Sequence, residues 1–231
     1  MPFSASPSQS RPLALDRSTL SQTYALFALA LGLTAVGVYL GMTYSEVLLT
    51  SGMSLLLVVI SFAIILSSSW WAHSSPLNYL LFALFPLISG ITVTPYLILV
   101  TTGYTNGGAI LLNALVATTL MAGASALFAL TTGWNLAFLG RTLLFALLGL
   151  LAVMILQLFI PALRLPEVEV IISGAGVIIF ALFTAYDVQR VQQLAGSGAN
   201  PFVLALSLYL DIFNLFLMIL RFMTAISGRR D

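Results

Sequence analysis

Two aspartates stand inside long apolar stretches of this sequence, and their chemistry is the starting point. Asp211 lies near the middle of 201–223, PFVLALSLYLDIFNLFLMILRFM, and Asp187 lies in the apolar stretch before it. An ionised carboxylate inside a bilayer is costly unless it is paired, hydrated or protonated. Carboxylates in such places typically bind protons or cations, so both residues are candidate functional groups.

The spacing of the two aspartates predicts that they meet. The segment 195–201, AGSGANP, consists of turn formers that should end one helix and start the next. Residue 199 is the midpoint, since 199 − 187 = 12 and 211 − 199 = 12. An antiparallel hairpin would therefore place both carboxylates at about the same depth. In the alternative interpretation, Asp187 lies near the interface and pairs with Arg190, one turn along its own helix.

Such a pair has a distinct chemistry. Two neighbouring carboxylates in a poorly hydrated site do not both ionise cheaply, so we expect them to share a proton near neutral pH and to titrate as a unit. Loss of that proton leaves like charges that repel each other or recruit a cation. Ca²⁺ suits such a site because it takes oxygen ligands. Thr184, Ser207 and Asn214 fall on the same helical stripes and are the predicted supporting oxygens, with Asp187 and Asp211 as transient Ca²⁺ ligands. Arg190 is the fourth predicted supporting polar residue.

Composition sets the fold class. Of 231 residues, 60% are hydrophobic and 6% are charged, whereas about a quarter of a soluble domain is charged. The sequence therefore predicts an all-α polytopic membrane protein whose main partner is the lipid bilayer. A net charge of +1 with scattered arginines argues against nucleic acid as a partner. No cysteine and one histidine leave no thiol nucleophile and no multi-histidine metal site, and no cofactor is expected.

Apolar stretches of about 20 residues are long enough to cross a bilayer, and seven are expected, in one domain over 19–228. A polar N-terminal tail, 1–18, is expected to be disordered, and 229–231 form a short C-terminal tail. The predicted spans are 20–42, 47–71, 77–100, 109–130, 138–160, 168–190 and 201–223.

The orientation of these spans is weakly determined. We place the N-terminus in the cytoplasm, but seven spans then put four arginines on each side, so the positive-inside rule does not decide. A last segment that dipped into the membrane and returned would bring the C-terminal arginines inside. Trp70 and Trp71 are expected at headgroup depth. Arg221 is expected to extend towards the interface from the end of its helix.

Several motifs resemble those of one family, the Bax inhibitor-1 family of seven-helix membrane proteins. They are Tyr186-Asp187, then ALSLYLDIFNLF over 205–216, then Leu220-Arg221-Phe222. The resemblance extends to Ser89-Gly90-Ile91-Thr92 with Pro95, and to Leu136-Ala137-Phe138-Leu139. It therefore covers most of the expected membrane domain and is most specific at the C-terminal end.

The resemblance implies a bundle with the last helix near its centre and the other six around it. It also implies a pH-sensitive calcium leak protein of the bacterial inner membrane, with Asp187 and Asp211 as the pH sensor. Some bacterial relatives carry a basic residue near the end of the second helix that holds one aspartate. Here 67–71 read SSSWW, without arginine or lysine, so any such latch must be built differently.

Two other function classes stay open. Intramembrane aspartyl proteases also carry Tyr-Asp on one helix and a second aspartate on the next, and two carboxylates sharing a proton can activate water. Those enzymes need Gly-x-Gly-Asp at the second position, where this chain has Tyr209-Leu210-Asp211, so an enzyme is not the favoured reading. The third class is a regulator that transports nothing and binds other membrane proteins.

Overall fold

The computed structural model describes residues 17–48 and 50–227, and its regular elements there are helices. Of the predicted tails, residues 1–16 and 229–231 lie outside the described residues. Residues 17 and 18 already belong to the first helix. The elements are α1 (Arg17–Thr43), α2 (Ser45–Leu48), α3 (Ser51–Leu66), α4 (Ser68–Trp71), α5 (Leu77–Gly103), α6 (Gly107–Thr131), η1 (Leu136–Phe138), α7 (Leu139–Phe159), η2 (Pro161–Arg164), α8 (Pro166–Leu194) and α9 (Pro201–Ile226).

In the described part of the chain, six helices are long and apolar enough to cross a membrane: α1, α5, α6, α7 with η1, α8 and α9. The protein is therefore an all-α polytopic membrane protein. The second expected span, over 47–71, is not one long helix: it contains α3, of 16 residues, between the short helices α2 and α4. Because α1 and α5 run parallel, with Gly37 near Leu87 and Gly41 near Thr94, this stretch returns the chain to the end of the bundle where α1 begins. At ~1.5 Å per residue α3 is roughly 24 Å long, which is less than the ~30 Å of a hydrocarbon core.

Polar residues at both ends explain why α3 is short. Thr50 has an extended backbone, with φ −60° and ψ 146°, so α3 cannot continue through it towards α2. At the other end the backbone of Ser67, with φ −90° and ψ 3°, leaves helical geometry before α4 begins. Of the two tryptophans expected at headgroup depth, Trp70 is 72% exposed. The Trp71 side chain is fully buried in the protein, and its indole N–H donates to the carbonyl of Ile64 at 2.8 Å.

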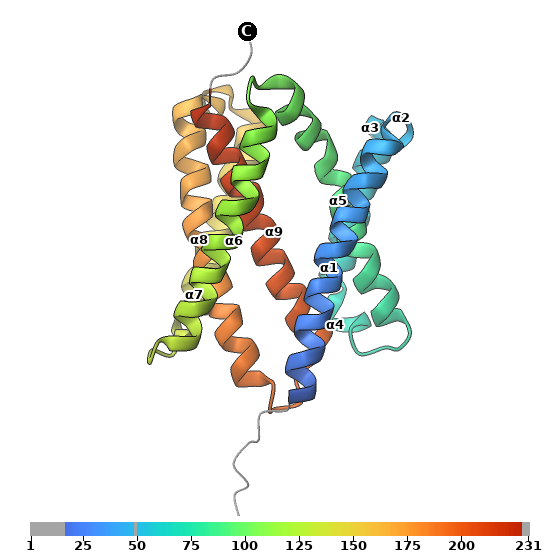
Figure 1. Ribbon diagram of the computed structural model, residues 1–231, viewed down its shortest axis with the longest axis vertical. Helices are drawn as coiled ribbons and strands as arrows, with labels where there is room; N and C mark the ends of the chain where they lie inside the picture. Colours follow the sequence, from blue (N-terminus) through green and yellow to red (C-terminus); the bar gives the residue numbers. More distant parts are fainter. Residues whose placement is uncertain (1–16, 49, 228–231) are drawn as a thin grey trace, which may run out of the picture.

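The last helix, α9, connects the two sides of the molecule. It packs along α8, α1 and α6 and also contacts α5, and Figure 1 shows it running obliquely between α1 and the group formed by α6 and α8. With α5 it is the most buried of the six long helices. It is continuous over 26 residues, so the segment does not dip in and return.

The turn between α8 and α9 is built by the predicted turn formers. Gly198 has φ 74°, a left-handed conformation that glycine adopts without strain. The Asn200 side chain accepts a hydrogen bond from the backbone N–H of Phe202 at 2.9 Å and so caps α9. Its amide group also donates to the carbonyl of Ala72 at 2.7 Å, which ties the turn to the end of α4.

Two glycines allow α1 and α5 to cross in close contact. A Cβ atom added to Gly37 of α1 would lie 2.1 Å from the carbonyl oxygen of Leu87. One added to Gly90 of α5 would lie 2.2 Å from the carbonyl oxygen of Thr34. Because real Cβ atoms do not approach so closely, only glycine permits this backbone contact, as at other small-residue crossings in membranes.

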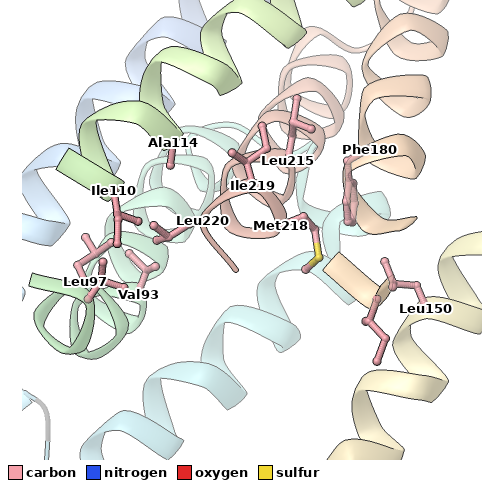
Figure 2. Packing of buried hydrophobic residues seen from close by; sticks show 12 residues of the cluster. Val93, Leu97, Ile110, Ala114, Leu150, Phe180, Leu215, Met218, Ile219 and Leu220 are labelled. Atoms are coloured by element: carbon pink, nitrogen blue, oxygen red, sulfur yellow. The ribbon is translucent and has the colours of Figure 1, made fainter. Parts of the chain in front are cut away.

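The second half of α9 lies in the largest apolar cluster. Ile219 and Leu220 of α9 face residues of α5 and α6, whereas Met218 points towards Leu150 of α7 (Figure 2). The first half of α9 contributes to two further clusters, one with α1, α4 and α5 and one with α6, η1 and α8. Packing on several sides fixes the position of α9, and with it that of Asp211.

Candidate functional site

The α8–α9 hairpin brings the two aspartates together. Asp187 of α8 is 3% exposed and Asp211 of α9 is 7% exposed. Both belong to one cavity wall, and the Asp187 carboxylate is near enough to Asp211 to interact with its charge. Two acidic side chains are thus buried side by side within helices that cross the membrane.

Asp187 has two polar partners. The Ser207 hydroxyl donates a short hydrogen bond to Oδ2 of Asp187, across the interface between α9 and α8. On the other side, Nη1 of Arg190 lies 3.5 Å from Oδ1 of Asp187. The alternative pairing of Asp187 with Arg190 therefore exists, but it does not move Asp187 to the surface. The carboxylate stays 5% exposed while the arginine side chain is 39% exposed.

Each aspartate has one buried oxygen without a hydrogen-bond partner, Oδ1 of Asp187 and Oδ2 of Asp211. Oδ1 of Asp187 has the charge of Arg190 at 3.5 Å. An unpaired buried carboxylate oxygen is expensive, so a group that completes it, such as a proton, a cation or water, is expected to bind there.

A cavity of about 630 Å³ adjoins both carboxylates. Helices α3, α5, α7, α8 and α9 form its walls. Its charged lining residues are Asp187, Arg190 and Asp211, and the rest are mostly aliphatic and aromatic. The lining residues on α3 and α5 are Val58, Ser61, Phe62, Ile65, Phe85, Ser89 and Thr92, and those on α7, α8 and α9 are Leu147, Leu151, Phe180, Phe183, Tyr186, Asp187, Arg190, Ser207, Leu210, Asp211, Phe213, Asn214 and Leu217.

The predicted supporting residues divide into two groups. Ser207, Asn214 and Arg190 line the cavity with the aspartates. The amide nitrogen of Asn214 donates to the carbonyl of Leu210 at 2.8 Å, which leaves its side-chain oxygen as an acceptor. Thr184 is not among the lining residues. It is buried, and its hydroxyl donates to the carbonyl of Phe180 at 2.8 Å, in the preceding turn of α8.

Sequence comparison now identifies the family. The family model described as "Inhibitor of apoptosis-promoting Bax1" matches residues 16–229. The chain belongs to the Bax inhibitor-1 family. Cj0236c of Campylobacter jejuni is 30% identical over 91% of this chain and 89% of its own length. A Helicobacter pylori protein is 32% identical over 92% and 88%, and the inner membrane protein YbhL of Escherichia coli is 29% identical over 95% and 96%.

The side-chain oxygens that line the cavity of this Bax inhibitor-1 protein limit how many ligands a metal ion could find there. No group of three or more His, Cys, Asp or Glu side chains that could hold a metal ion occurs among the described residues. The cavity lining offers two carboxylates, the Asn214 amide oxygen and hydroxyl groups that include those of Ser207 and Tyr186 on the hairpin and Ser61, Ser89 and Thr92 on α3 and α5. Because Ca²⁺ takes six to eight oxygen ligands, these groups suit an ion that keeps much of its water and stays briefly.

A second polar cluster of this Bax inhibitor-1 protein lies far from the aspartates, and sequence reasoning missed it. Arg221 of α9 donates from Nε to Oε1 of Glu169 on α8 at 2.6 Å. Its Nη2 atom donates to Oε1 of Gln157 on α7 at 3.2 Å. The Gln157 amide in turn donates to Oε2 of Glu169 at 2.9 Å. Arg221 therefore joins three helices, and the expectation that it extends to the interface is corrected.

One signal in the sequence could have found this cluster. The midpoint of 169 and 221 is residue 195, since 195 − 169 = 26 and 221 − 195 = 26. This midpoint lies within about one helical turn of the aspartate midpoint, 199. The hairpin argument that paired the aspartates thus also pairs Glu169 with Arg221.

Proposed function

We propose that this protein is a pH-sensitive calcium leak pathway, gated by protonation of Asp187 and Asp211. The observation that carries the proposal is the buried carboxylate pair on one cavity wall, with a partnerless oxygen on Asp211. The name of YbhL supports placement in the bacterial inner membrane. We place the N-terminus in the cytoplasm. The start of α1 and the α8–α9 turn lie at the same end of the bundle (Figure 1).

The gating step follows from the chemistry of neighbouring carboxylates. With one proton shared between them, the pair carries a single negative charge, which Arg190 balances, and α8 and α9 stay together. Removal of the proton at higher pH leaves two like charges in a poorly hydrated cavity. Repulsion between them, or entry of a divalent cation, then relieves the excess negative charge. Flux is therefore expected to rise as the pair loses its proton.

Arg190 takes the place of a basic latch on the second apolar helix. Residues 67–71 offer no cation, but Arg190 approaches the same carboxylate from within α8. Around the pair, Arg190 is the charged group besides the aspartates in the cavity lining, and α3, α5 and α7 contribute uncharged lining side chains. A deprotonated pair with Arg190 carries a net charge of −1, which favours a cation over an anion in the cavity.

The test is calcium flux into liposomes that contain the purified protein and a calcium-sensitive dye, measured over a pH series. We expect the wild-type flux to depend on pH and Asp187→Asn and Asp211→Asn to lose that dependence. Glu167→Gln is the matched control, because it makes the same chemical change at an exposed position of α8. Its pH profile should match the wild type.

Two results would replace the proposal with another function. Absence of wild-type flux at every pH would favour a regulator that binds other membrane proteins. Cleavage of a transmembrane peptide, lost in both aspartate variants, would favour an intramembrane protease. We propose no enzymatic activity, because the residues before Asp211 are Tyr209 and Leu210 and not the Gly-x-Gly that such proteases need.

A further inference from the structure

The cavity is larger and more apolar than a calcium pathway requires. Its volume, about 630 Å³, falls in the range of about 300–1,000 Å³ that small-molecule sites occupy. Its charged groups all come from α8 and α9, while Phe62 of α3 and Leu151 of α7 are among its apolar lining residues. A hydrated ion uses only the polar part. The apolar part lacks a role in the proposed leak.

The cavity adjoins the lipid. Phe62 of α3 is 63% exposed and Leu151 of α7 is 44% exposed, and both line the cavity. Helix α7 is long and apolar enough to cross the membrane, and α3 is a shorter apolar helix, so these exposed side chains face hydrocarbon. A molecule with an alkyl chain can therefore reach the cavity from the bilayer without crossing water.

The charge at the inner end of the cavity selects the headgroup. Arg190 is already paired with Asp187, whereas Oδ2 of Asp211 is buried and has no hydrogen-bond partner. An ammonium group would take the place of the proton that the pair shares. It would donate to that oxygen and balance the second negative charge of the pair through a charge-assisted hydrogen bond. A carboxylate headgroup would meet the negative charge of the pair, and a hydroxyl headgroup would bring no positive charge to replace the shared proton.

We propose that this cavity binds a single-chain amphiphile with an ammonium headgroup, the headgroup at Asp211 and the alkyl chain along the apolar wall between α3 and α7. This site goes beyond the proposed leak. It does not require calcium flux, so binding can be found or refuted whether or not the protein conducts ions.

The test compares three water-soluble probes of one chain length: octylamine, octanol and octanoate. Each is titrated at neutral pH into the full chain in phosphatidylcholine nanodiscs, and uptake by empty nanodiscs is subtracted. We expect saturable binding of octylamine, at least about tenfold tighter than octanol or octanoate because of the charge-assisted bond. Asp211→Asn should lose this preference, and Glu167→Gln should keep it. Leu151→Trp, which adds bulk at the lipid-facing rim, should weaken octylamine binding.

Three outcomes would overturn the proposal: no saturable octylamine uptake above the empty nanodiscs, equal affinity for octanol, or unchanged octylamine binding in Asp211→Asn. If Asp211→Asn does not fold, two other measurements decide whether the cavity binds the amphiphile. They are the comparison of the three headgroups in the wild type and the effect of Leu151→Trp on octylamine binding. Calcium flux without octylamine binding would refute this site and leave the leak intact. Octylamine binding without calcium flux would support this site and refute the calcium leak.

Discussion

Arg221 and Glu169 form an ion pair, with Nε of Arg221 2.6 Å from Oε1 of Glu169. The pair joins α9 to α8 at the end of the hairpin opposite its turn. Glu169 precedes Asp187 by 18 residues, since 187 − 169 = 18, which is roughly 27 Å along a helix at ~1.5 Å per residue. The hairpin is therefore held by two separate polar contacts, one at its open end and one, between Asp187 and Ser207, nearer the turn.

We predict that removal of either partner of this ion pair destabilises the bundle. Glu169→Gln leaves the Arg221 charge partly buried without its carboxylate, and Arg221→Met leaves the Glu169 charge without its cation. Each is expected to lower the free energy of unfolding by about 1–3 kcal/mol, the usual scale for a hydrogen bond to a charged group. Thermal unfolding in detergent, followed by circular dichroism, measures the change.

The double variant and a control separate this pair from general effects of charge. Glu169→Gln with Arg221→Met should lose less than the sum of the single variants, because neither charge is then left alone. Glu167→Gln changes an exposed carboxylate two residues away and should alter stability by less than about 0.5 kcal/mol. Additive losses in the double variant would contradict a direct interaction.

The aspartate pair and its hairpin could be predicted because both depend on short-range sequence features. The turn formers end α8 and begin α9, and equal spacing from the turn places Asp187 and Asp211 at matching positions. Ser207 could be placed beside them because it precedes Asp211 by one helical turn. These inferences needed helix periodicity and one turn, and no knowledge of how the other helices pack.

The expectations that differ from the structure depended on local backbone geometry or on distant packing. Hydropathy alone extended the second span through Thr50 and Ser67, since an average over apolar neighbours does not register a backbone that leaves helical geometry at single residues. The burial of Trp71 was not predicted, because it depends on contacts with other helices. Thr184 lies on the same stripe as Asp187, yet its hydroxyl bonds to the Phe180 carbonyl. Gln157, on another helix, could not be placed beside Arg221 without the fold.

Ser207→Ala is predicted to weaken the link between α8 and α9. The substitution removes the hydroxyl that donates to Asp187, and the buried carboxylate loses a partner. We expect a loss of about 1.5–3 kcal/mol in unfolding free energy at neutral pH, as for other hydrogen bonds to charged groups. Ser207→Thr retains a hydroxyl and should lose less. The same stability for Ser207→Ala and the wild type would mean that this bond contributes nothing net.

The contact between α1 and α5 is predicted to tolerate no methyl group. Gly37→Ala and Gly90→Ala each place a Cβ within about 2 Å of a backbone carbonyl oxygen of the other helix, so the helices must separate. We expect each variant to lose about 1–3 kcal/mol or more in thermal unfolding measurements. Gly32→Ala, also in α1, meets nothing within 4 Å and is the matched control. It should be neutral or slightly stabilising, because alanine favours a helix over glycine by roughly 0.5–1 kcal/mol.

Arg190→Gln is predicted to increase calcium flux with little effect on stability. The arginine side chain is 39% exposed and lies 3.5 Å from Asp187, so its ion pair should contribute less than about 1 kcal/mol to folding. Its positive charge lines the cavity, however, and repels an entering cation. Removal of roughly 1 kcal/mol of repulsion would raise flux about fivefold at a pH where the aspartates have lost their shared proton.

Arg141→Gln makes the same charge change at an exposed residue of α7 outside the cavity lining and should leave flux unchanged. Equal increases in both variants would point to a general surface-charge effect, and lower flux in Arg190→Gln would show that the arginine assists passage.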